Sequence, residues 1–262
     1  MKHQKTIVVF DNGKILETAD WKSIYASYDR SIRQVDFPLG AGTLTLRQKE
    51  CYYLNDGANK KKQWQRNGVI YLKDRFIENL VNVEKWKPES KIVIDNAPKQ
   101  FTLYPSREIY KTEGGALGSF DFLTSGDDGC KAAIEWETGN ISSSHRSLNK
   151  MCICLAKGAI SVGVLIVSSR NLYAHLTDRI GNIAELNPYL SLWRMVGEKI
   201  TKGALVISVI EHDALTTNPQ FPYLNDGDAE CDFRIARTSD QLELWPLDAG
   251  EAPPQAVHLV SA

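Results

Sequence analysis

The stretch GSFDFLTSGDDGCKAAIEWETGNISSSHRS, residues 118–147, contains the clearest structural pattern of this chain. It has an apolar run around Asp121, a turn rich in glycine and aspartate at 126–129, and a second apolar run at 132–134. The second run ends in Glu135 and Glu137. Because Gly and Asp favour tight turns, the pattern predicts two short strands joined by a turn, with acidic side chains on both.

These three acids are candidate catalytic or metal-binding residues. Asp121 lies within an apolar run, and a carboxylate buried there requires partners. We expect regular pleating to separate Glu135 from Glu137, and a bend or bulge at the strand end to bring both toward one site. Mg²⁺ prefers oxygen ligands, usually one or two carboxylates with phosphate oxygens of the substrate. The three acids therefore form a candidate Mg²⁺ site.

The residues that follow predict a helix and a buried strand. Ser142 or Ser143 can cap a helix whose apolar stripe is Leu148, Met151, Cys152 and Leu155, and Gly158 suits the position just past its end. The apolar run 162–167 reads as a strand covered on both faces. Strand, helix and strand form a βαβ crossover, so this part of the sheet should be parallel.

The rest of the chain predicts further helices and strands around this unit. We expect strands at Thr6–Phe10, Lys91–Asp95 and Ala204–Ile210, a helix from an Asp20 cap to about Val35, a helix over Asn67–Val83, and helical pieces over Tyr173–Arg194. The fold class is therefore α/β, a mixed sheet with a parallel βαβ core flanked by helices. We expect one domain over residues 1–262, with its core at about 67–210 and elaborations at both ends.

Composition excludes some classes of protein. The 262 residues carry 31 basic and 32 acidic side chains, a net charge of −1, which gives no global attraction to nucleic acid or membrane. No apolar stretch reaches 18 residues, so no transmembrane helix is expected. The five cysteines are scattered and lack zinc-site spacing, which predicts reduced, mostly buried thiols in a cytoplasmic protein.

Charge is distributed unevenly along the chain. Between Lys60 and Arg75, six basic residues stand against one acid, a net of +5, with Trp64 and Tyr71 interleaved. Between Asp226 and Glu251 the net charge is −6. A basic patch on a neutral protein is either a contact for a phosphate backbone or a solvated surface.

The ordered elements resemble the core of PD-(D/E)xK nucleases. Glu135-Trp136-Glu137 is similar to the motif of the BamHI/BglII group of type II restriction endonucleases, in which Glu or Gln replaces the usual lysine. The helix before Trp86, two strands, and then Gly-Ser-Phe-Asp-Phe-Leu match that group's order of elements over roughly residues 67–168. The chain departs from the superfamily pattern in having Phe120 where a proline is expected before the acid.

The resemblance implies a Mg²⁺-dependent cleavage of double-stranded DNA at a short, palindromic site by a homodimer. It assigns Asp121 and Glu135 as metal ligands, with the carbonyl of Trp136. It gives Glu137 the place of the lysine, as general base, orienter of water or further ligand, and Glu78 is the candidate for the helix glutamate that often completes such sites. Candidate DNA contacts are basic residues beside the site and in the +5 segment: Lys61, Lys62, Arg66, Arg146 and Lys150.

Other interpretations of the same residues remain open. The acids can act on another substrate, such as a glycoside, although only Trp136 supplies an adjacent aromatic ring. The chain can also be a DNA-binding protein with an inactive nuclease core. Arg146 and Lys150 can be solvated charges on a helix, and the serine run 142–144 can serve only as a cap.

Overall fold

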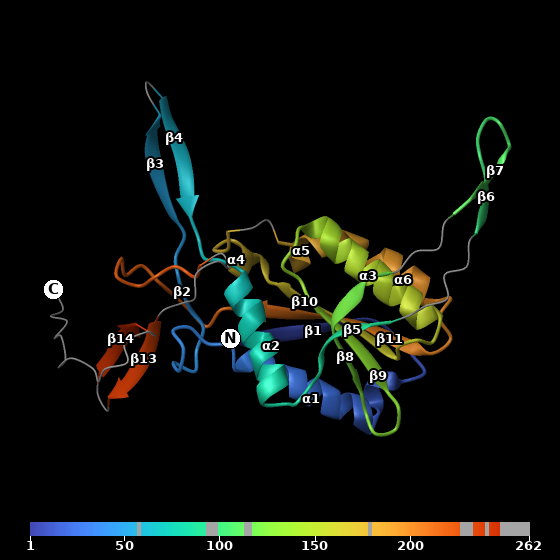
Figure 1. Cartoon of the computed structure of the whole chain (residues 1–262), viewed down its shortest axis with the longest axis horizontal. Helices are drawn as coiled ribbons and strands as arrows, with labels where there is room; N and C mark the ends of the chain where they lie inside the picture. The colour runs from blue at the N-terminus through green and yellow to red at the C-terminus, as the bar shows by residue number, and fades with distance from the viewer. Residues whose placement is uncertain are drawn as a thin grey trace.

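Residues 118–147 contain two adjacent strands, β8 and β9, of a six-stranded sheet with the order β1-β11-β10-β9-β8-β5 (Figure 1). The computed structural model describes residues 1–56, 59–92, 99–112, 117–177, 180–225, 233–238 and 241–246. The strands of this sheet are β1 (Lys2–Asn12), β5 (Pro88–Lys91), β8 (Ser119–Ser125), β9 (Lys131–Trp136), β10 (Val162–Ser168) and β11 (Gly203–Glu211).

The predicted strand pairing is confirmed. β8 and β9 form an antiparallel hairpin, and β9 pairs in parallel with β10 after the crossover helix α3 (Ile141–Ala156). β10 also pairs in parallel with β11, whereas β1 lies antiparallel along the outer side of β11. The sheet is therefore mixed, with a parallel βαβ core, as the sequence predicts.

Helices cover both faces of this sheet. On one face, α1 (Ala19–Arg33) and α2 (Ile70–Asn82) share a core with Ile134 of β9 and Val164 of β10. On the other face, α3 and α6 (Leu190–Gly197) share a core with Ala133 and Leu165 of the same strands. Successive residues of a strand point to opposite faces, so these uninterrupted apolar runs serve two cores at once.

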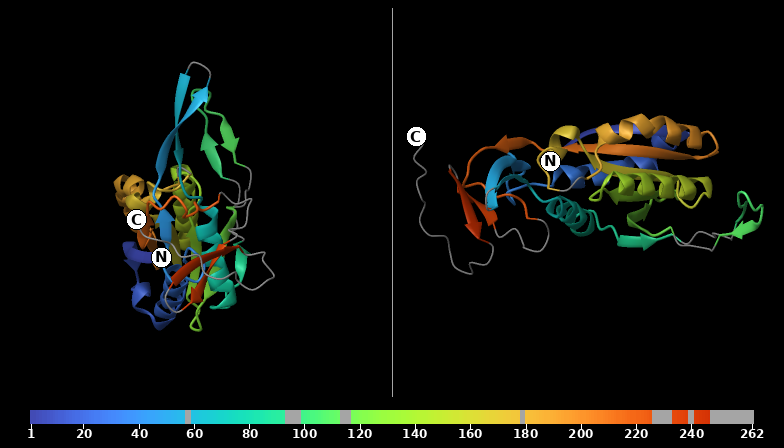
Figure 2. Two further views of the ribbon diagram at one scale, coloured as in Figure 1. Left: turned by 90° about the vertical axis from the view of Figure 1, so that its left-hand side faces the viewer. Right: turned by 90° about the horizontal axis from the view of Figure 1, so that it is seen from above.

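Two hairpins stand away from the body and point to the same side of the molecule (Figures 1 and 2). One pairs β3 (Glu50–Asp56) with β4 (Asn59–Gln65), and the other pairs β6 (Gln100–Thr102) with β7 (Ile109–Lys111). The remaining elements are η1 (Ile15–Glu17), β2 (Thr45–Arg47), α4 (Arg170–Tyr173), α5 (Ile183–Leu186), η2 (Asn187–Tyr189), β12 (Ala214–Thr216), β13 (Phe233–Thr238) and β14 (Gln241–Pro246).

Helix ends differ from prediction by a few residues. Thr18, not Asp20, caps α1 through its hydroxyl, and the Asp20 carboxylate instead accepts the backbone amides of Asp128 and Cys130, each at 3.0 Å. The cap of α3 is Asn140 rather than a serine. Both misplaced caps arise because several capping residues stand together at each helix start, and only the three-dimensional structure selects one.

Some predictions fall partly outside the described residues. β5 ends at Lys91, residues 93–98 are not described, and most of the acidic segment 226–251 also lies outside the described ranges. Of the four cysteines described, Cys152 and Cys154 are buried, Cys130 is partly buried and Cys51 is exposed, so the prediction of mostly buried thiols holds only in part. Among the helices described, none has the length and hydropathy needed to cross a membrane.

Candidate active site

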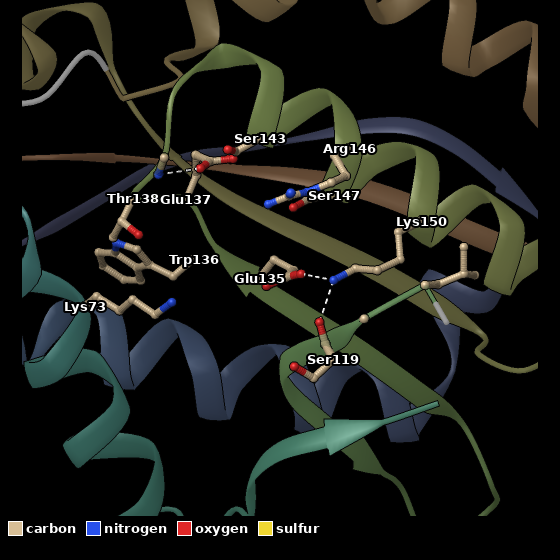
Figure 3. A pocket seen from close by; sticks show the side chains of 13 residues that line it. Lys73, Ser119, Glu135, Trp136, Glu137, Thr138, Ser143, Arg146, Ser147 and Lys150 are labelled. Carbon is tan, nitrogen blue, oxygen red and sulfur yellow. Dashed lines mark hydrogen bonds and ion pairs between the residues drawn. The ribbon is translucent and has the colours of Figure 1, made fainter. Parts of the chain in front are cut away.

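A pocket of about 620 Å³ lies where β8, the end of β9, α2 and α3 meet (Figure 3). Five charged side chains line it: Lys73, Glu135, Glu137, Arg146 and Lys150. The pocket therefore brings together two of the three candidate acids and three basic residues from two helices.

Asp121 is fixed at both of its carboxylate oxygens. Oδ1 accepts a hydrogen bond of 2.8 Å from Nζ of Lys73, and Oδ2 accepts one of 2.8 Å from the backbone amide of Trp136. The residue is not itself part of the pocket wall, whereas the lysine bound to it is. The sequence prediction that this carboxylate needs partners is thus confirmed, and the partners come from α2 and β9.

Glu135 stands beside Asp121 on the neighbouring strand. The β8–β9 pairing ends with Phe122 opposite Ile134, so each acid directly adjoins the last paired residue of its strand, and the two carboxylates are close enough for their charges to interact. Nζ of Lys150 donates to Oε1 of Glu135. Burial raises the pKa of Glu135, and the negative charge of Asp121 raises it further, while Lys150 opposes both effects.

Glu137 lines the same pocket without any bulge in β9. The register of β9 with β10 is continuous, and the amide of Glu137 extends it by donating to the carbonyl of Ile166 at 2.9 Å. The prediction that pleating separates Glu135 from Glu137 was wrong, because residues two apart on a strand share a face. Trp136, between them, is buried on the opposite side against Phe76.

The side chain of Glu137 is almost fully buried. Its Oε1 accepts the amide of Gly139 at 2.6 Å. Burial raises the pKa of this carboxyl group, and the charge of Glu135 adds to the effect. A carboxyl group with a raised pKa is suited to accept a proton near neutral pH.

Helix α2 brings a lysine to the site and not the expected glutamate. Glu78 is half-exposed, pairs with Arg75 and does not line the pocket. It lies five residues after Lys73, about 140° further around the helix. The structure therefore does not place Glu78 with the other candidate site residues.

The other predicted basic residues occupy four different environments. Arg146 is exposed on the pocket wall and forms no hydrogen bond or ion pair with any residue that the structure describes. Lys61 and Lys62 are exposed on β4, where Lys62 lies 4.9 Å from the ring centre of Trp64. Lys150 is buried, so a solvated role for it is wrong. Arg66 is partly buried beside the carbonyl of Leu176, 3.5 Å from its Nη1.

The donor set fits a hard divalent cation. Asp121 and Glu135 supply adjacent carboxylates, which are hard oxygen ligands. One oxygen of each carboxylate already accepts a hydrogen bond from a positively charged lysine ammonium, so each oxygen faces a position that a cation can occupy. Within the described residues, no three His, Cys, Asp or Glu side chains are grouped as a metal site. Metal binding here would therefore use two carboxylates with backbone or substrate oxygens.

Sequence reasoning missed Lys73 at this site. It was counted within the +5 segment, but its pairing with Asp121 spans 48 positions in sequence. Its helical position gives one usable signal, since Lys73 adjoins Leu72 and lies one turn before Ile77 on α2. That position predicts a side chain near the edge of the buried stripe, without identifying its partner.

The fold and the pocket define an α/β protein with a charged site at the end of a βαβ unit. The family model described as "Restriction endonuclease BamHI" matches residues 1–229. The chain therefore belongs to the BamHI restriction endonuclease family.

Two curated relatives are similar to parts of this chain. The type II restriction enzyme OkrAI of Oceanobacter kriegii is 53% identical over 83 residues, which are 32% of this chain and 42% of that protein. The type II restriction enzyme BamHI of Bacillus amyloliquefaciens is 30% identical over 126 residues, 48% of this chain and 54% of that protein. The chain thus spans about half the length of the curated relatives it matches.

A solved structure of restriction endonuclease BglII complexed with a DNA 16-mer also matches. It is 11% identical, with a TM-score of 0.47, and the match covers 84% of this chain and 87% of that one.

Proposed function

We propose that this protein is a type II restriction endonuclease that hydrolyses phosphodiester bonds of double-stranded DNA at a short, palindromic site. The observation that carries the proposal is the closeness of Asp121 and Glu135 on adjacent strands beside a charged pocket, in a chain of the BamHI family. Restriction endonucleases generally require a divalent metal, and we propose Mg²⁺ because the available ligands are hard oxygens.

In this proposal Asp121, Glu135 and the carbonyl of Trp136 hold the metal. When bound, the metal neutralises the phosphate and lowers the pKa of a water molecule at the site. Glu137 would orient the attacking water and take up its proton, because its carboxylate lines the same pocket as Glu135. Gly139 keeps this carboxylate in place through its amide. Glu78 has no role in the proposed site.

DNA would reach the site along two basic surfaces. Arg146 lies on the pocket wall with no partner among the described residues, so it is free to contact the scissile phosphate. Lys61 and Lys62 are exposed on the β3–β4 hairpin, which joins α2 and thus the wall that carries Lys73. These contacts would supply the local phosphate attraction that a net charge of −1 cannot.

We further propose a homodimer formed through α3 and α6. These helices lie together, since Nε1 of Trp193 donates to Oδ1 of Asn149 at 3.1 Å. Their outer side exposes apolar residues that no described element covers: Ile153 on α3, with Leu192, Met195 and Val196 on α6. An apolar patch of this kind favours association, and a symmetric pair would present one site to each strand. Light scattering should give the mass of a dimer, and a monomer both free and on DNA would contradict this.

The test of the proposed reaction is cleavage of duplex DNA of varied sequence with Mg²⁺, Mn²⁺ or Ca²⁺. We expect discrete fragments with Mg²⁺, and none from Asp121→Asn, which should still bind DNA. Asp127→Asn is the matched control, because Asp127 is exposed on the turn between β8 and β9. Binding without cleavage under every metal would favour a DNA-binding protein with an inactive core, and wild-type cleavage by Asp121→Asn would refute the metal ligands.

A further inference from the structure

Each of the two carboxylates proposed as metal ligands already accepts a hydrogen bond from an ammonium group on a helix. Nζ of Lys73 on α2 donates to Asp121, and Nζ of Lys150 on α3 donates to Glu135 (Figure 3 shows the second pair). Both pairs are shielded from water, with 25% and 18% of the side-chain surface exposed in the first and 9% and 14% in the second. Such shielding strengthens the attraction between opposite charges.

Lys73 stands between Asp121 and the pocket. It lines the pocket wall, whereas the carboxylate it binds does not. The other oxygen of Asp121 is occupied by the amide of Trp136. A cation that enters from the pocket therefore reaches Asp121 at the oxygen that Lys73 now holds.

Lys150 has contacts that do not depend on Glu135. Its ammonium donates to the carbonyl of Ser119 at 2.6 Å and lies 4.1 Å from the ring centre of Phe120. These two contacts can retain the ammonium in the pocket wall after Glu135 turns toward another cation.

We propose that Lys73 and Lys150 are resident counter-ions of the site, which hold Asp121 and Glu135 while metal is absent and give up these oxygens when metal binds. This proposal rests on the proposed metal-dependent function. In this chain Glu137 stands where the related nuclease motif usually has a lysine. The proposal explains how ammonium groups still lie beside the acids, since Lys73 on α2 and Lys150 on α3 supply them from outside that motif. The two lysines are positioning residues, because they act through the carboxylates.

The proposal predicts that removing a lysine improves metal binding. Removing a positive charge next to a cation site should tighten metal binding, whereas removing a purely structural support should weaken it. Mn²⁺ binding to DNA-free protein, followed by electron paramagnetic resonance, separates the two. We expect Lys150→Met to bind Mn²⁺ about tenfold more tightly than wild type, because one repulsive charge is gone. Lys150→Arg keeps the charge and should bind as wild type does.

Lys157→Met is the matched control, because Lys157 is exposed at the end of the same helix. Its Mn²⁺ affinity should be unchanged. Lys73→Met provides a second variant if Lys150→Met does not fold, as judged by circular dichroism, and it too should tighten Mn²⁺ binding. In cleavage assays, both variants should reach half-maximal rate at a lower Mg²⁺ concentration.

Unchanged or weaker Mn²⁺ binding by a folded Lys150→Met and a folded Lys73→Met would overturn the proposal. Failure of the proposed function looks different. If wild-type protein binds no Mn²⁺, both the proposed metal site and the proposed role of the lysines are refuted. If the proteins bind Mn²⁺ with the predicted differences but wild type leaves DNA intact, only the proposed nuclease activity is refuted.

Discussion

The pair formed by Glu135 and Lys150 makes a quantitative prediction about stability. Only 14% and 9% of the two side chains are exposed, so replacing Glu135 with leucine leaves an ammonium group buried without its carboxylate. Breaking a buried pair from one side costs about 3–5 kcal/mol. We expect a value near 3 kcal/mol, because Lys150 keeps the carbonyl of Ser119 and the ring of Phe120.

Removing both charges should restore most of that stability. Glu135→Leu with Lys150→Met replaces the pair by apolar groups of similar volume, and such replacements are often neutral or stabilising. The double variant should therefore lie within about 1 kcal/mol of wild type, which makes the coupling energy about 2 kcal/mol or more. For a chain of this size, the single variant should melt about 6–12 °C lower.

Urea unfolding of metal-free protein, followed by tryptophan fluorescence, measures these free energies. The control is a cycle on Lys14 and Glu17, an exposed pair 3.6 Å apart, whose coupling should be below about 0.5 kcal/mol. If Glu135→Leu costs less than about 1 kcal/mol and the cycle on the buried pair is additive, the two side chains are not paired in solution and the reasoning fails.

Three further predictions concern the acid at 137, the basic hairpin and the helix cap. Burial raises the pKa of Glu137 above its ordinary 4.5, so the folded protein binds the carboxyl proton more tightly than the unfolded chain does. The contribution of this proton to folding stability is therefore full below pH 4.5 and is lost as the pH rises through the raised pKa. Glu137→Gln should therefore gain stability over wild type in unfolding titrations near neutral pH, a gain that fades toward pH 4.5, and a gain constant with pH would contradict this. Lys61→Gln with Lys62→Gln should lower the salt slope of DNA binding by about 0.9 for each phosphate that these lysines neutralise, measured by fluorescence anisotropy, and an unchanged slope would mark them as solvated. Asn140→Ala removes the acceptor for two amides of α3 and should cost about 1 kcal/mol in urea unfolding, whereas Ser142→Ala should cost almost nothing.

The sequence was sufficient for the βαβ core because its signals there are local. The apolar runs around Asp121 and before Glu135 have strand length, the turn between them is rich in glycine, and the stripe on α3 has helical spacing. The neighbouring positions of Asp121 and Glu135 follow from that hairpin alone. The pairing of β1 with β11 joins strands about 200 residues apart in sequence, and no local pattern specifies it.

The contents of the pocket were less predictable, for a physical reason. Lys73 and Lys150 have partners 48 and 15 positions away, and helix periodicity gives the face of a lysine but not the acid it meets. Glu78 shows the same limit of helix periodicity. Its position off the apolar stripe is equally compatible with a place in the site and with the exposed ion pair that it forms with Arg75.

Asp121 is also a joint between parts of the chain that are far apart in sequence. One of its carboxylate oxygens accepts a hydrogen bond from the side chain of Lys73 on α2, and the other accepts one from the backbone amide of Trp136 on β9. A chain in which α2 has not docked, or in which the hairpin has slipped, cannot hold this carboxylate in place. If Asp121 binds metal as proposed, the site would form only after this assembly is complete, and an incompletely folded molecule would not cleave the DNA of its own cell.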